Sequence, residues 1–185
     1  MENLLGVSPK DNMLHGPTKL LLDAYHWHQP DFGIVASYTP KPRDVEDHFG
    51  VFRGVDQIEA FAQATIVSCG SFNECKKHHC TPLALKEKFI PAFISIGNVS
   101  FHHYVAEGET FISIGIIKFY KFRQMVCDGR IYKVAKGVDL DAYFRDFDQD
   151  RIAAYDLSKD FTLVAELYDI TGRALKKDIF EKAEG

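Results

Sequence analysis

The stretch between Asp47 and Ala64 holds the residues best suited to chemistry. His48 ends an extended segment, and Glu59 follows it by eleven positions inside an apolar run that begins after Gly54. Imidazole titrates near neutral pH and can act as a base. A carboxyl group that is removed from water favours its protonated form, which can donate a proton. The first N–H groups of a helix beginning at Gly54 could polarise a carbonyl. This combination suits removal of a proton next to a carbonyl group.

The spacing alone leaves a second interpretation open, in which Glu59 lies on the exposed side of its helix and His48 is an ordinary loop residue. The helix itself is the best-supported element, because apolar residues recur at intervals of three and four between Val55 and Ser71. The many small residues in this stretch predict that the helix is deeply buried. The apolar positions are Val55, Ile58, Ala62, Ile66 and Cys69, with Phe61 beside them.

The remaining elements up to Gly137 are predicted to be mostly strands. Residues 19–28 and 34–39 form the first two, and the segments 91–105, 110–122 and 130–137 are rich in β-branched and aromatic residues. The Asp128-Gly129 pair is a typical hairpin turn before the last of these strands. One buried helix with a hairpin-rich antiparallel sheet predicts an α+β fold.

Composition and charge narrow the possible functions. The chain has 185 residues, a formal net charge of -4, 15 Phe and 8 Tyr, which is typical of a globular domain rather than a disordered chain. Its isoelectric point near 6.0 argues against nucleic acid as a partner. No apolar run approaches the roughly 20 residues that span a bilayer, and the N-terminus lacks an export signal. Four cysteines without a dense pattern predict reduced thiols and a cytoplasmic location.

The charge balance changes near Gly137. Residues 138–185 carry 12 acidic and 7 basic side chains, a net of -5, whereas residues 1–137 carry 14 and 15, a net of +1. We therefore expect a body, residues 1–137, and an acidic C-terminal extension, residues 138–185. The extension contains two stretches with helical spacing, and residues 161–177 could form a strand, a turn about Thr171-Gly172 and a second strand; the pattern leaves the structure of the extension open.

Two clusters that suggest metal binding are weak. Cys75, His78, His79 and Cys80 fit no standard spacing of zinc ligands, so a polar connecting segment is the better interpretation. The acidic residues between 146 and 150 imitate a calcium loop, but Arg151 stands where that loop needs glycine. We expect no metal site.

A family resemblance is carried by the stretch around His48. Asp47-His48-Phe49-Gly50, then Gly54-Val55, then the run Ile58-Glu59-Ala60-Phe61-Ala62-Gln63 resembles the central segment of the 3-hydroxyacyl-[acyl-carrier-protein] dehydratases of fatty-acid synthesis. The likeness extends over about residues 17 to 136, including Leu20-Leu21-Leu22-Asp23 in the first strand. It implies a hot-dog fold, an antiparallel sheet wrapped around one central helix, for residues 1–137.

The resemblance implies a role for each matched residue. His48 would remove the α-proton of a 3-hydroxyacyl thioester, and Glu59 would protonate the departing β-hydroxyl, giving a trans-2-enoyl thioester. Gly54 would present its N–H to the thioester carbonyl, Val55 would contact substrate, and Gln63 would orient Glu59. No cofactor is implied. The substrate would be carried by acyl-carrier protein or coenzyme A, and the protein would be a homodimer or a dimer-based oligomer with each site shared between two chains.

The sequence departs from the family pattern at this site. Asp47 and Gly50 replace a glycine and a proline, and the segment between His48 and Glu59 is about three residues shorter than the family's. We expect the His48 ring still to face the start of the central helix. Two alternatives remain: an acyl thioesterase in which Glu59 activates water, and a non-catalytic acyl-binding protein. The C-terminal extension could pack on the sheet, cover the acyl tunnel or extend the dimer.

Overall fold

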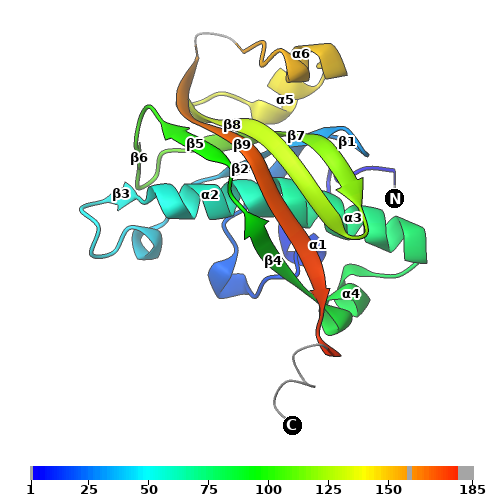
Figure 1. Ribbon diagram of the computed structural model, residues 1–185. Coiled ribbons are helices and arrows are strands. Elements are labelled where there is room, and N and C mark those ends of the chain that lie inside the picture. Colours follow the sequence, from blue (N-terminus) through cyan, green and yellow to red (C-terminus); the bar gives the residue numbers. More distant parts are fainter. Residues whose placement is uncertain (1, 158–159, 179–185) are drawn as a thin grey trace.

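An antiparallel sheet curves around one long helix in the computed structural model, which describes residues 2–157 and 160–178 (Figure 1). The main sheet has the order β1-β2-β7-β8-β9-β4, with β5 pairing alongside β4 on β9. A separate two-stranded sheet joins β3 and β6. The strands are β1 (Ala24–Gln29), β2 (Gly33–Tyr38), β3 (Val51–Phe52), β4 (Phe89–Ser95), β5 (Asn98–Phe101), β6 (Val105–Ala106), β7 (Phe111–Lys121), β8 (Gln124–Val134) and β9 (Phe161–Lys176).

The long helix is built from three consecutive segments. It begins as α2 (Gly54–Ala62), widens into a π-helical turn, η3 (Gln63–Val67), and continues as α3 (Ser68–His78). The predicted helix at residues 55–71 is therefore confirmed, and it extends further at its C-terminal end. The shorter helices are α1 (Pro9–Asn12), η1 (Pro17–Lys19), η2 (Pro42–Asp44), α4 (Pro82–Lys88), α5 (Leu140–Phe144) and α6 (Gln149–Ala153).

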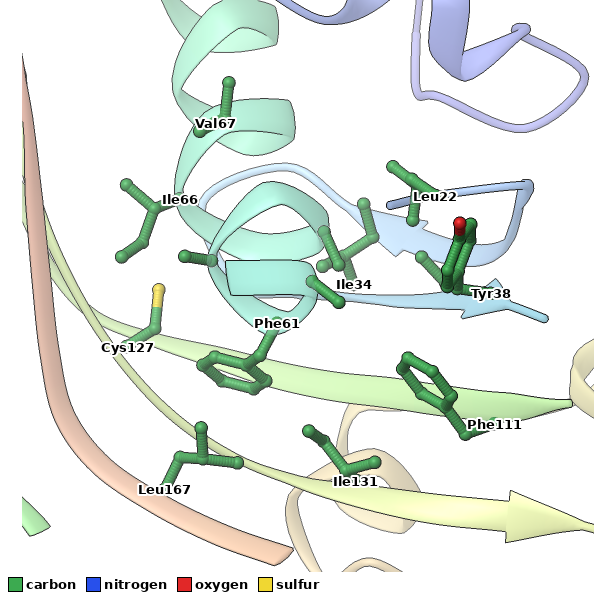
Figure 2. Close-up of a cluster of buried hydrophobic side chains, with 14 of the residues drawn as sticks. Leu22, Ile34, Tyr38, Phe61, Ile66, Val67, Phe111, Cys127, Ile131 and Leu167 are labelled. Atoms are coloured by element: carbon green, nitrogen blue, oxygen red, sulfur yellow. The ribbon is translucent and has the colours of Figure 1, made fainter. Parts of the chain in front are cut away.

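Glycines in the sheet let the long helix approach it closely. A Cβ atom at Gly129 would lie 2.5 Å from the ring of Phe61, and one at Gly115 would lie 1.9 Å from Cγ2 of Thr65. Gly115 and Gly129 are directly paired across β7 and β8. Figure 2 shows Phe61 directed from the helix toward Ile131 and other core side chains of the sheet. The helix is thus held by a core of interlocking side chains rather than by surface contacts.

The segment after residue 137 is part of the same sheet. Helices α5 and α6 pack on the face opposite the long helix, where Phe144 and Ile152 join a second buried cluster with Trp27 (Figure 1). The Trp27 indole donates a hydrogen bond to the carbonyl of Phe147 at 2.9 Å. Strand β9 then enters the main sheet between β8 and β4. A boundary at residue 137 therefore falls inside the sheet domain, because the sheet is incomplete without β9.

The turns predicted at Asp128-Gly129 and at Thr171-Gly172 are both absent from the structure. β9 is one continuous strand through Thr171-Gly172, and Asp128-Gly129 lies inside β8. The hairpin between β7 and β8 instead turns at Phe122 and Arg123, whose φ angles are 54° and 62°. Gly172 and Gly129 are needed for the helix: a Cβ at Gly172 would lie 2.7 Å from the Ile66 side chain.

Among residues 2–157 and 160–178, no helix combines the length and the apolar composition needed to cross a membrane.

Candidate active site

A cavity of about 70 Å³ runs along one face of the long helix. The helix contributes side chains at intervals of three and four residues, with Glu59 at one end, Ile66 in the middle and Glu74 at the other end. The opposite wall comes from β4 and β9, and the N-terminal segment adds Leu14 and His15. The cavity is therefore apolar along its middle and polar at both ends, a form suited to a chain-like ligand.

The Glu59 carboxyl is held at its end of the cavity by Gln63. Gln63 Nε2 donates to Glu59 Oε1 at 2.9 Å and to the carbonyl of Lys19 at 2.8 Å, while Gln63 Oε1 accepts from the Leu21 N–H at 2.9 Å. Gln63 is fully buried, whereas 35% of the Glu59 side chain is exposed. The amide thus ties the N-terminal segment to the helix and fixes a carboxyl group that a ligand can reach.

His15 is a second neighbour of Glu59, and nothing in the sequence around either residue predicts their contact. Its Nε2 lies 3.4 Å from Glu59 Oε1. Burial lowers the pKa of His15, and the nearby Glu59 carboxylate acts in the opposite direction. The buried Nδ1 of His15 has no hydrogen-bond partner in the described part of the chain. The two residues are 44 positions apart, and no local pattern marks a contact that depends on the path of the N-terminal segment.

His48 lies on an exposed loop before β3, outside this cavity. Its Nδ1 is 2.9 Å from the Val51 carbonyl. Because a carbonyl can only accept, Nδ1 is the donor in this bond, so in the neutral ring the lone pair lies on Nε2. Neighbouring residues Asp47 and Phe49 have positive φ angles of 57° and 55°, and Phe49 is completely exposed. Among the described residues of one chain, no hydrogen bond or ion pair joins His48 to Glu59.

Gly54 is the first residue of α2, where backbone N–H groups have no partner within the helix. The ring of Phe101, from β5, lies over it, since a Cβ at Gly54 would be only 2.8 Å from Phe101 Cζ. Val55 is 64% exposed beside it. Phe101 was missed from the sequence because nothing local places β5 over the helix start.

Cysteine and histidine residues are concentrated in α3 and in the turn after it. No group of three or more His, Cys, Asp or Glu side chains within residues 2–157 and 160–178 is arranged to hold a metal ion. Burial also raises the pKa of the Cys75 thiol to about 12, which disfavours the thiolate that metals bind.

Comparisons with known proteins give structural relatives only. No protein-family model matches the chain, and no curated protein matches its sequence. A chain of the dehydratase heterocomplex ApeI:P from Xenorhabdus doucetiae superposes with a TM-score of 0.65 at 12% identity, covering 97% of this chain and 98% of that one. The PaaI protein of the E. coli phenylacetic acid degradation operon gives a TM-score of 0.47 at 11% identity, covering 82% and 78%. With the sheet and central helix described above, the likeness to the ApeI:P chain shows that this chain has the hot-dog fold.

Proposed function

We propose that this protein is a 3-hydroxyacyl-thioester dehydratase whose sites each combine Glu59 of one chain with His48 of another. The observation that carries the proposal is the Glu59 carboxyl, fixed by a buried Gln63 at the end of an apolar cavity. The His48 geometry supports it, because the bond from Nδ1 to Val51 leaves Nε2 as a base.

The reaction follows from the roles of these groups. Nε2 of His48 takes the proton from C2 of the substrate, and negative charge develops on the thioester oxygen, where the N–H of Gly54 stabilises it. Glu59, in its protonated form, gives its proton to the C3 hydroxyl. The C3–O bond breaks, water leaves, and the electron pair of the former C2–H bond forms the C2=C3 double bond. Each proton-transfer group is expected to contribute about 10²–10⁴-fold.

A second copy of the chain is proposed to supply the missing half of the site. In the described part of the chain, β4 and β5 pair only with β9, which leaves their outer edge open. Apolar side chains on and beside this edge are 39% to 64% exposed, a set we call the edge surface: Ile90, Phe93, Ile94, Ile96, Phe101 and Tyr104. Pairing two such edges around a two-fold axis would bury the edge surfaces and bring two long helices together.

An assay with two substrates tests the proposal and separates its alternatives. Crotonyl and 3-hydroxybutyryl thioesters of coenzyme A and of acyl-carrier protein are offered, and enoyl absorbance and free thiol are followed separately. Interconversion of the two thioesters supports dehydration. Thiol release would indicate a thioesterase that uses Glu59 to activate water, and neither signal would indicate an acyl-binding protein.

Variants connect this activity to the site. Glu59→Gln keeps the shape and the Gln63 contact but cannot supply the proton, so turnover should fall by about 10²–10⁴-fold. Glu87→Gln changes an exposed glutamate of α4 and is the matched control, with turnover expected to be unchanged. Equal turnover in both variants would remove Glu59 from the mechanism.

A further inference from the structure

The far end of the cavity carries a second polar cluster that dehydration does not use. Tyr120 donates a hydrogen bond to Glu74 Oε1 at 2.6 Å, and Glu74 is only 5% exposed. Burial, together with this carboxylate, raises the pKa of Tyr120. Ser71 and Arg123 line the same end of the cavity, and the Arg123 guanidinium lies over the ring of Phe89. A buried carboxylate, a phenol, a hydroxyl and a guanidinium therefore meet at the end of an apolar cavity.

Three buried polar atoms of this cluster have no hydrogen-bond partner within the described residues: Ser71 Oγ, Glu74 Oε2 and Arg123 Nε. Ser71 is 3% exposed. Glu74 Oε2 also lies 3.3 Å from Nε2 of the half-exposed His78, which pairs with it only when that ring is protonated. Buried polar groups are nearly always paired, and leaving one unpaired costs about 1–3 kcal/mol. All three side chains line the same end of the cavity, where a polar group of a ligand is the partner that would satisfy them.

The two polar ends lie on one face of the helix. Glu59 and Glu74 are fifteen residues apart, which corresponds to about 22 Å along a helix. The helix residues that line the cavity between them include Ala62, Ile66 and Gly70, all apolar or small. An extended chain advances about 3.5 Å for every three bonds. Allowing for the inward reach of the two side chains, roughly 12 to 18 bonds separate groups bound at the two ends.

We propose that the cavity selects long acyl chains that carry a hydroxyl group at the end remote from the thioester. The placement of the thioester at Glu59 rests on the proposed function. A hydroxyl group can donate to Glu74 Oε2 and accept from Arg123 Nε or Ser71 Oγ, so it satisfies atoms that a methyl end would leave unpaired. A terminal carboxylate would accept from Arg123 but would meet the Glu74 carboxylate.

Binding measurements test this selectivity independently of catalysis. The probes are pantetheine thioesters of dodecanoic, tetradecanoic and hexadecanoic acid, each with a methyl, an ω-hydroxyl or an ω-carboxyl end. None has a 3-hydroxyl group, so none can be dehydrated. Dissociation constants are measured by calorimetry with the wild-type protein. The ω-hydroxyl probe should bind at least about tenfold more tightly than its methyl counterpart at one or more lengths, because it pairs buried groups.

Variants of the cluster make the result specific. Glu74→Leu should remove the preference and improve binding of the methyl-ended probe, since the cavity end becomes apolar. Ser71→Ala removes one oxygen atom and should reduce the preference about threefold or more even if Glu74→Leu does not fold. Ser95→Ala, at the exposed last residue of β4 and outside the cavity lining, is the control and should leave the preference intact.

The outcomes separate this inference from the proposed function. Equal binding of methyl-ended and ω-hydroxyl probes at all lengths would overturn the inference, even if dehydration of 3-hydroxybutyryl thioesters were observed. Tighter binding of the ω-carboxyl probe would also overturn it, because Arg123 rather than the paired donor and acceptor would then dominate. A clear ω-hydroxyl preference in a protein without dehydratase activity would support the inference and refute the proposed function.

Discussion

Replacing Gly115 by alanine tests how tightly the long helix is held against the sheet. A Cβ at this position would lie 1.9 Å from Thr65 Cγ2 and 3.0 Å from Thr65 Cβ. Alanine in a strand is normally favoured over glycine by about 0.5–1 kcal/mol. Overpacking in a filled core costs about 1–3 kcal/mol. We therefore expect Gly115→Ala to lower the free energy of unfolding by about 1–2 kcal/mol.

A second substitution identifies the clash as the cause. Thr65→Ser removes Cγ2 but keeps the hydroxyl, which donates to the Phe61 carbonyl at 2.8 Å. In the Thr65→Ser background, Gly115→Ala should cost at least about 1 kcal/mol less than in the wild type, because the overlapping atom is gone.

Urea unfolding of the four proteins in this cycle gives the coupling energy, provided that the m-value stays constant. Gly70→Ala is the control, since no heavy atom lies within 4 Å of a Cβ there. Its position inside α3 should make alanine stabilising by up to about 1 kcal/mol. An equal cost of Gly115→Ala in both backgrounds would refute the proposed contact.

Two further predictions concern buried polar residues. Burial lowers the pKa of His28 from 6.5 to about 4, and its Nδ1 accepts from the Leu4 N–H, so the folded protein holds His28 neutral. Because the unfolded chain binds the proton more readily, the free energy of unfolding should fall by up to about 3 kcal/mol between pH 6.5 and about 4. His28→Gln should flatten this dependence, measured by urea unfolding across pH; an unchanged slope would contradict the assignment. Gln63→Ala leaves the Leu21 N–H and Lys19 carbonyl without their partner, so unfolding should become easier by about 1–3 kcal/mol. The kcat of Gln63→Ala for dehydration should also fall, whereas the kcat of the control variant Glu87→Gln should be unchanged. A Gln63→Ala protein that is stable and fully active would show that the Gln63 amide does not position Glu59.

The sequence predicts the central helix well because its pattern reports burial directly. Spacings of three and four residues mark the buried side of the helix at Ala62, Ile66 and Cys69, whereas Val55 at the start of the pattern is 64% exposed. The position of Gln63 one turn after Glu59 predicts their contact. These are local relations along one helix, and they do not depend on the path of the rest of the chain.

The two wrong turn predictions have one physical origin. Gly129 and Gly172 were interpreted as turn residues, whereas both lie within strands, where the absence of a side chain admits Phe61 and Ile66. A sequence does not distinguish a glycine that permits a positive φ angle from a glycine that lets another side chain approach the backbone closely. Only the tertiary structure separates these two roles. The misread turn at Gly172 also hid β9, which made the chain after residue 137 look like a separate extension.

The far end of the cavity and His15 depend on long-range packing. His15 reaches Glu59 from 44 positions away, and Tyr120 reaches Glu74 from 46 positions away. Neither pair has a local sequence signal, because the path of the N-terminal segment and the curvature of β7 decide which side chains meet. The sequence therefore predicts Glu59 as a candidate acid but not the groups that surround the cavity.

A mixed-dimer experiment tests the shared site most directly. If both residues act in dehydration, the His48→Ala protein and the Glu59→Ala protein are each inactive alone. The two proteins are then mixed under conditions in which subunits exchange. When each site takes the two residues from different chains, a mixed dimer holds one site with both lesions and one with neither. Random pairing gives about half mixed dimers, so roughly a quarter of wild-type activity should return. Persistent inactivity, with exchange verified by an affinity tag, would contradict the shared site.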